Sequence, residues 1–108
     1  MIEGITATEL SKQLDSQKTK LVLVDVREAD EWEICRIEGA QLIPLSEFAE
    51  RSLEALSKED KLVLYCHHGV RSERAAAWLV QNGYTLVRNL LGGIDAWSLD
   101  VDNKIPRY

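Results

Sequence analysis

The stretch KLVLYCHHGVRSERAAAWLVQNG, residues 61–83, carries the strongest structural signal in the chain. Its opening segment, Lys61–Cys66, is almost wholly apolar, which is typical of a strand covered on both faces of a sheet. The alanine-rich segment Ser72–Asn82 favours a helix, and Gly83 is placed to end it. A short loop joins the two segments. The stretch therefore predicts a strand–loop–helix unit of an α/β domain.

Three further segments outside this unit are predicted to be strands. The aliphatic run LVLVDV, Leu21–Val26, has the same character as the first strand, and YTLVRNL, residues 84–90, resembles it. A brief strand is expected at Gln41–Ile43, where Pro44 stops it.

Helices are expected between the strands. Thr6 and Glu9 have the spacing of a capping box, which predicts a helix that begins directly after Thr6. EADEWEI, residues 28–34, predicts a short helix, and Ser46 is placed to cap another. A last short helix is expected at Gly92–Trp97, and the pair Gly92-Gly93 is expected to open it.

Strands and helices thus alternate along the whole chain. This order predicts a small α/β domain with a mainly parallel sheet, helices on both faces and right-handed crossovers. The 108 residues suit one domain, residues 1–108, with a core that needs no disulfide. Sheets of this kind bind ligands at the carboxyl ends of their strands, where Asp25, Arg27, Cys66 and the Gly92-Gly93 turn fall.

Charge and composition exclude several classes of partner. The net charge of −5 argues against nucleic acid or an anionic membrane as the main partner. The first residues, MIEGITATEL, lack the basic and apolar regions of a secretion signal, and no apolar run approaches the roughly 18 residues of a membrane span. We therefore expect a cytoplasmic protein whose two cysteines, Cys35 and Cys66, are free thiols.

Cys66 is the candidate nucleophile. A packing role is the simplest alternative, since cysteine is among the residue types most often buried. However, Cys66 ends a strand, a tight loop containing Gly69 follows, and Arg71 stands where the loop meets the helix. Backbone N–H groups of such loops and of helix N-termini attract anions and favour the thiolate form of a cysteine. These features favour nucleophilic chemistry over packing.

A metal site and a redox pair are weaker interpretations of the same stretch. His67 and His68 follow Cys66 directly, and adjacent side chains at a strand end are expected to diverge instead of converging on one ion. With two histidines and two cysteines in the chain, a four-ligand zinc site would need nearly all of them. The sequence has no C-x-x-C pair of the thioredoxin type. We therefore expect no metal ligands here.

The length of the loop separates phosphate chemistry from sulfur chemistry. Cysteine phosphatases place five residues between the cysteine and the arginine, which makes a cradle wide enough for a phosphoryl group. Here four residues separate Cys66 from Arg71. A tighter ring suits a single sulfur atom carried on Cys66 and disfavours a cysteine phosphatase or an arsenate reductase.

The sequence resembles a single-domain rhodanese, a sulfurtransferase, over essentially its whole length. Three blocks carry the resemblance, in order and at similar spacings: VDVREADEWEICRIEGAQLIP (Val24–Pro44), CHHGVRS with its alanine-rich helix, and LLGGIDAW (Leu90–Trp97). The resemblance implies the rhodanese-like three-layer α/β fold, a five-stranded and mainly parallel sheet with helices on both faces.

The resemblance also implies a mechanism without a cofactor. Cys66 would take the outer sulfur of a small anionic donor such as thiosulfate, release sulfite and hold a persulfide. A thiol, small or on a protein, or cyanide would then accept the sulfur. Backbone N–H groups would stabilise the persulfide, and Arg71 would hold the loop and attract the donor. The residues implied in substrate binding are His67, His68, Gly69, Val70, Arg71 and Ser72.

Other residues have supporting roles in this interpretation. Asp25 and Arg27 are expected to form a buried ion pair that supports the loop. Cys35-Arg36 replaces the Gly-His that the family often has before I-x-G-A, and Cys35 is an alternative resolving thiol for Cys66. The tail after residue 99 is expected to wrap the surface, and the three tryptophans are expected in the core: Trp32, Trp78 and Trp97.

A rival interpretation keeps the fold but changes the substrate. The chain would then be a sulfur-relay or protein-binding module whose partner is a protein and not thiosulfate. An intact cysteine and loop favour catalysis, and the sequence leaves the physiological donor and acceptor open.

Overall fold

Five parallel strands form the sheet, in the order β1-β5-β4-β2-β3. A computed structural model describes residues 2–16, 18 and 20–108 of the protein. The predicted parallel sheet is confirmed. The strands are β1 (Glu3–Ile5), β2 (Leu21–Asp25), β3 (Gln41–Leu42), β4 (Lys61–Tyr65) and β5 (Val87–Leu90).

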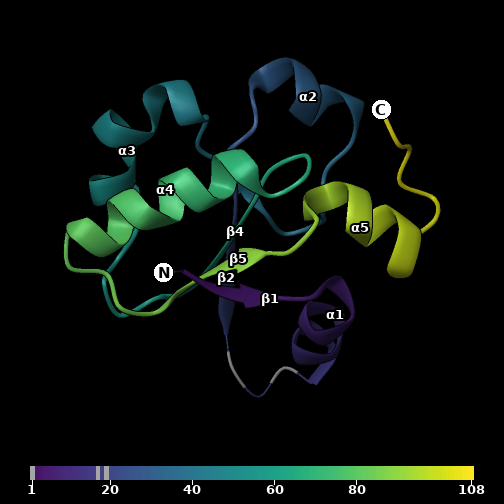
Figure 1. The fold of residues 1–108 in the computed structure, drawn as a ribbon, viewed down its shortest axis with the longest axis horizontal. Coiled ribbons are helices and arrows are strands. Elements are labelled where there is room, and N and C mark those ends of the chain that lie inside the picture. Colours follow the sequence, from purple (N-terminus) through teal and green to yellow (C-terminus); the bar gives the residue numbers. More distant parts are fainter. Residues whose placement is uncertain (1, 17, 19) are drawn as a thin grey trace.

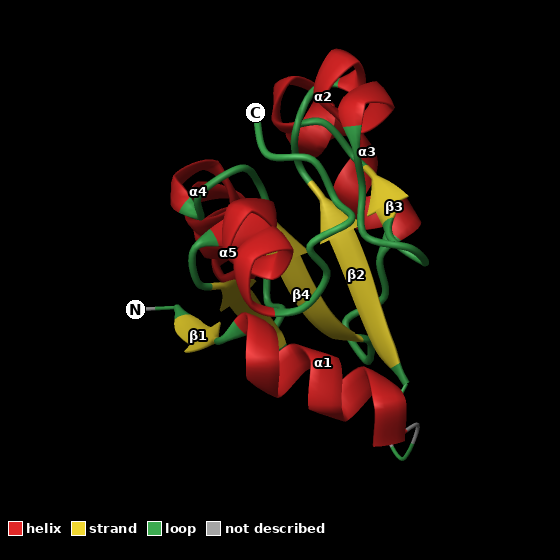
Figure 2. Ribbon diagram, turned by 90° about the vertical axis from the view of Figure 1, so that its right-hand side faces the viewer, coloured by secondary structure: helices red, strands yellow, loops and turns green. Residues whose placement is uncertain are grey.

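Helices cover both faces of the sheet, as predicted, and one lies above its carboxyl edge (Figures 1 and 2). One face carries α1 (Ala7–Ser16) and α5 (Gly93–Asp100), and the other carries α3 (Phe48–Ala55) and α4 (Val70–Gln81). Beyond the end of β2 lies α2 (Ala29–Ile34), and a 3₁₀ turn, Leu45–Glu47, leads into α3. Among the described residues, every helix is too short or too polar to cross a bilayer.

The core consists of two apolar clusters, one on each face of the sheet. Alternate residues of β4 enter opposite clusters, because side chains of a strand point to opposite faces. Leu62 and Leu64 pack with α3 and α4, whereas Val63 and Tyr65 pack with α1 and α5. The unbroken apolar run of the sequence is therefore explained by burial on both sides.

Strand β1 and the start of helix α4 differ from the sequence expectations. Strand β1 was not predicted from its residues, since only Ile5 of its three residues is buried and its partner, β5, is distant in sequence. Helix α4 begins at Val70, two residues before the predicted start, because Gly69 takes the N-cap position. Part of the predicted loop after Cys66 is therefore the first helical turn.

Two smaller predictions are wrong. Ser46 does not cap α3: it lies within the 3₁₀ turn, and its hydroxyl donates a hydrogen bond to Glu28 Oε1 at 2.9 Å. Of the three tryptophans, Trp97 alone is buried in the core. Trp78 packs at the margin of a cluster, and Trp32 lies partly exposed with the Arg36 guanidinium over its ring.

The capping box of α1 is confirmed by reciprocal hydrogen bonds at its first turn.

Candidate active site

The carboxyl ends of three neighbouring strands bring the candidate residues to one edge of the sheet. Asp25 ends β2 and pairs in register with Tyr65 of β4, the residue before Cys66. The Gly92-Gly93 turn follows β5 on the other side of β4. The predicted clustering at this edge is therefore confirmed, since strands of a parallel sheet all end on the same side.

Cys66 lies at the bottom of the loop between β4 and α4. Its side chain is buried, and its sulfur accepts a hydrogen bond from the backbone N–H of Gly69 at 3.0 Å. The hydroxyl of Ser72 lies 3.4 Å from the same sulfur. Gly69 has a φ of +107°, in the left-handed region that favours glycine, and this conformation turns its N–H inward. The loop thus places one backbone donor at the sulfur and a hydroxyl within reach of it.

Asn89 on β5 holds this loop from below. It accepts a hydrogen bond from the Ser72 hydroxyl at 2.5 Å, and its amide donates to the carbonyl of Gly69 at 3.0 Å. The Ser72 hydroxyl has one hydrogen, so it can donate to Asn89 or to Cys66 but not to both at once. Sequence reasoning missed Asn89. The available signal was one amide in an apolar strand at the sheet's active edge.

The Gly92-Gly93 turn packs directly against the loop backbone. A Cβ atom on Gly93 would overlap the carbonyls of Cys66 and His67. The N–H groups of Ile94 and Asp95, in the first turn of α5, donate to these same carbonyls at 2.9 and 3.2 Å. Gly93 permits this close approach of the two backbones, and α5 is fixed to the loop by it.

Arg71 forms a bidentate ion pair with Glu31 of α2. Its two terminal nitrogens lie 2.6 and 2.8 Å from the two carboxylate oxygens of Glu31. The hydrogen bonds from Arg71 outweigh burial and lower the pKa of Glu31 to about 2, and the same contact raises the pKa of Arg71. Sequence reasoning placed Arg71 at the site but did not identify Glu31 as its partner.

Asp25 and Arg27 form the expected buried ion pair, with an N–O distance of 2.6 Å and no exposed surface on either side chain. Burial works against the charge of Arg27, but hydrogen bonds to Asp25 and Tyr108 outweigh it and raise its pKa. Arg27 also donates to the carbonyls of Glu31 and Cys35 at 3.3 and 2.6 Å. Arg27 therefore supports the loop indirectly. It holds α2, and α2 carries Glu31, the partner of Arg71.

The C-terminal tail reaches the site instead of only wrapping the surface. The ring of Tyr108 stacks on His67 with 3.8 Å between centroids. Its hydroxyl accepts a hydrogen bond from Arg27 at 2.8 Å and donates one to Glu31 at 2.8 Å. Burial is the largest of the influences that together raise the pKa of Tyr108 to about 12. No sequence pattern distinguished this tyrosine from an ordinary surface residue.

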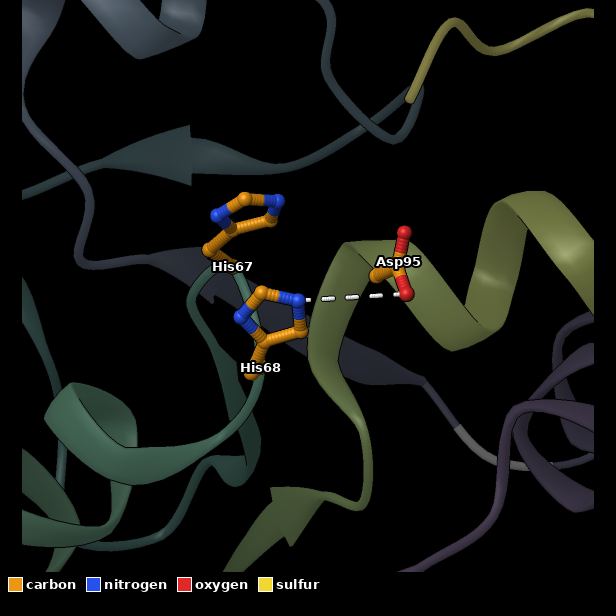
Figure 3. A group of neighbouring side chains, drawn as sticks. All are labelled: His67, His68 and Asp95. Atoms are coloured by element: carbon orange, nitrogen blue, oxygen red, sulfur yellow. Dashed lines mark ion pairs between the residues drawn. The ribbon is translucent and has the colours of Figure 1, made fainter. Parts of the chain in front are cut away.

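The two histidines do not diverge. Their rings stack, with 4.0 Å between centroids and 27° between planes, and both face Asp95 of α5 (Figure 3). The geometric argument against convergence is therefore wrong for His67 and His68, because the backbone turns sharply between β4 and α4. Cys66, the third residue of that argument, is not part of the group with Asp95. Asp95 was not singled out in the sequence.

The remaining candidates are Val70 and Cys35. Val70 is 64% exposed and lies where the loop meets α4. Cys35 and Cys66 are both free thiols, as expected, and the Cys35 thiol donates to the carbonyl of Pro106 at 3.5 Å. The resolving role of Cys35 stays a prediction.

A family model described as "Rhodanese-like domain" matches residues 6–100. The chain belongs to the rhodanese-like family. The match covers strands β2 to β5, the four-residue loop and the glycine turn, so the resemblance inferred from three sequence blocks is confirmed.

Curated relatives of the chain differ in length. The chain is 42% identical over 105 residues to "Probable adenylyltransferase/sulfurtransferase MoeZ" of Mycobacterium tuberculosis, covering 96% of this chain but 26% of MoeZ. It is 45% identical over 95 residues to YqhL of Bacillus subtilis, covering 88% and 75% of the two chains. The chain thus spans about a quarter of the length of the first curated relatives it matches.

A solved structure supports the same fold. The rhodanese-like domain protein from Staphylococcus aureus superposes with a TM-score of 0.82 at 31% identity, and the match covers 89% of this chain and 91% of that one. The rhodanese-like fold predicted from the sequence is therefore confirmed.

Proposed function

We propose that this rhodanese-like chain is a sulfurtransferase in which Cys66 carries sulfur as a persulfide. The Cys66 thiolate attacks the outer sulfur of thiosulfate, a new S–S bond forms, and the bond to the sulfonate sulfur breaks to release sulfite. In the second half-reaction a thiolate or cyanide attacks the outer sulfur of the persulfide. The Cys66 thiolate leaves and is ready for another cycle. The electrons balance without an external oxidant.

One observation carries this proposal: the N–H of Gly69 points at the Cys66 sulfur within a loop of four residues. A persulfide is an anion, and fixed backbone donors stabilise it without moving during the reaction. Ser72 supplies a second donor when its hydroxyl turns from Asn89 to the sulfur. His67 and His68 at the rim would contact donor and acceptor as they enter.

Arg71 has two roles in the proposal. It fixes the start of α4 through Glu31, and its charge attracts an anionic donor to a protein that is acidic overall. Because Glu31 neutralises part of this charge, the attraction is weaker than for an unpaired arginine. Asp25 and Arg27 support the arrangement from below through α2.

A sulfur relay and a thiosulfate sulfurtransferase differ in the molecule that accepts the sulfur. MoeZ, of which this chain matches a quarter, is named an adenylyltransferase as well as a sulfurtransferase. This favours, as a second candidate, a sulfur relay in which a protein supplies or receives the sulfur. A cytoplasmic location, proposed from the sequence, fits either role.

Intact-mass measurement tests the persulfide directly. After mixing with thiosulfate, the protein should gain the mass of one sulfur atom, and a thiol or cyanide should remove it. Cys66→Ser should gain nothing, whereas Cys35→Ser should gain sulfur as the parent does. If the parent stays unmodified with thiosulfate and with a persulfide donor, the proposed function is wrong.

Steady-state turnover separates the two candidates. Substantial turnover of thiosulfate and cyanide by folded protein supports the small-molecule enzyme. A persulfide that forms but turns over negligibly supports the relay. Hydrolysis of a phosphomonoester that is lost in Cys66→Ser would contradict both, and the four-residue loop predicts none.

A further inference from the structure

We propose that His67, His68 and Asp95 form a binding site for one divalent transition cation of the type represented by Zn²⁺. Each side chain offers one donor atom, and the three atoms lie within 4.8 Å of one another (Figure 3). Two imidazole nitrogens and a carboxylate oxygen are a ligand set that zinc takes in proteins, with a fourth position left for water or an anion.

The backbone holds the three ligands in a fixed relation. Asp95 donates its N–H to the carbonyl of His67 at 3.2 Å, and the neighbouring Ile94 donates to the carbonyl of Cys66 at 2.9 Å. Gly93 lets the start of α5 approach this closely. The segment that supplies the carboxylate is therefore tied to the segment that supplies the imidazoles, and the ion would have to order only the side chains, of which that of His68 is 62% exposed.

The ring of His67 is also positioned and has an unused nitrogen. It lies between the rings of His68 and Tyr108, with centroid distances of 4.0 and 3.8 Å. Its Nε2 atom is buried and has no hydrogen-bond partner among the described residues. A buried nitrogen without a partner costs free energy, which coordination to a cation would recover.

Arg107 is the competitor at this site. Its nitrogens lie 2.8 and 3.2 Å from the two oxygens of Asp95. The arginine side chain is 58% exposed, so its pairing is weakened by water and salt and a cation can displace it. His68 pairs more loosely, with 3.9 Å between its Nε2 and the carboxylate. We therefore expect a modest affinity and not that of a structural zinc site.

Calorimetric titration with Zn²⁺ tests the site in untagged protein that carries Cys35→Ser and Cys66→Ser. These substitutions remove the thiolates, which would otherwise bind zinc themselves. One equivalent should bind, and His68→Ala or Asp95→Asn in the same background should each lower the affinity at least about tenfold. Asp100→Asn, an exposed carboxylate on the same helix, is the matched control and should bind like the parent.

Three outcomes would overturn the proposal. The first is no binding to the double-serine protein, whose fold is checked by its thermal transition. The second is binding that survives both ligand substitutions. The third is a Co²⁺ complex of the native protein with sulfur charge-transfer absorption, lost together with binding in Cys66→Ser. Because persulfide formation plays no part in these readouts, the proposed function can fail without affecting this test.

Discussion

At the scale of the residue, Asn89 shows how one amide can organise a reactive loop. Its two polar atoms contact different parts of the loop, the Ser72 hydroxyl and the Gly69 carbonyl. Both contacts lie in buried surroundings, where a lost partner costs about 1–3 kcal/mol. The residue does not touch the reacting sulfur in the contacts observed, so we regard it as a positioning residue.

Asn89→Ala should therefore slow persulfide formation about tenfold or more and lower the free energy of unfolding by about 1–3 kcal/mol. Single-turnover reaction with thiosulfate and denaturant unfolding measure the two effects. Asn82→Ala is the matched control, since Asn82 donates a comparable hydrogen bond to Trp78 at the far end of α4. It should lose stability while persulfide formation stays near the parental rate. Equal rates in both variants would contradict the positioning role.

At the scale of the element, the start of α4 links loop conformation to chemistry. Gly69 is both the N-cap of the helix and the donor to the Cys66 sulfur. The loop and the first turn of α4 are therefore one continuous unit. The sequence predicted the start of the helix two residues too late. The alanine-rich pattern marks the helical interior, but the first turn consists of loop residues that have no apolar periodicity.

Gly69→Ala should reduce persulfide formation strongly, because an alanine at a φ of +107° is strained by about 1–2 kcal/mol and favours a backbone that turns the N–H away. The added Cβ itself would meet neighbours at ordinary contact distances, from 3.5 Å outward, so the loss would be one of conformation. Single-turnover kinetics measure it.

Gly39→Ala is the matched control, because it adds a similar backbone strain at a glycine that has no part in the proposed reaction. Gly39 has a φ of +89° and nothing within 4 Å of an added Cβ. It should lose a similar amount of stability and retain the parental rate. If both glycine variants keep that rate, the Gly69 N–H is unimportant to the reaction.

At the scale of the whole molecule, an ionic network connects parts of the chain that are far apart in sequence. Glu31 of α2 pairs with Arg71 of α4, and Tyr108 contacts Glu31 and the buried Arg27. The elements around the sheet's carboxyl edge are thus joined through one carboxylate. Its substitution should alter the stability of the fold and the binding of the donor.

Glu31→Gln should destabilise the protein most at neutral pH. The pKa of Glu31 is lowered from its ordinary 4.5 to about 2, so its contribution is complete above about pH 4.5 and is lost as the pH falls toward 2. The shift corresponds at most to about 3 kcal/mol, and exposure of Arg71 reduces the expected loss to about 1 kcal/mol. Unfolding curves of parent and variant should differ at pH 7 and converge near pH 2.

The same variant should lower the KM for thiosulfate severalfold, because Arg71 keeps its charge and loses the neutralising carboxylate. Steady-state kinetics at low salt measure this, and added salt should reduce the difference. A raised KM would mean that Glu31 positions Arg71 for the donor more than it neutralises it.

The sequence predicted the parts of this molecule that depend on local pattern. The buried strands, the capping box at Thr6 and the position of Cys66 at a strand end all follow from composition and spacing. It did not predict β1, Asn89 or Tyr108, since each of these depends on a partner far along the chain. The stacking of His67 and His68 was missed for a related reason: it depends on how sharply the loop turns, which one sequence does not reveal.

The position of Tyr108 has a consequence for protein engineering. Its ring touches His67, next to the proposed nucleophile Cys66, so a peptide joined behind residue 108 emerges beside the loop between β4 and α4. A short flexible extension ending in cysteine would meet the persulfide at an effective concentration in about the millimolar range. Such a fusion turns sulfur transfer into an intramolecular event, and it offers a way to trap the acceptor complex.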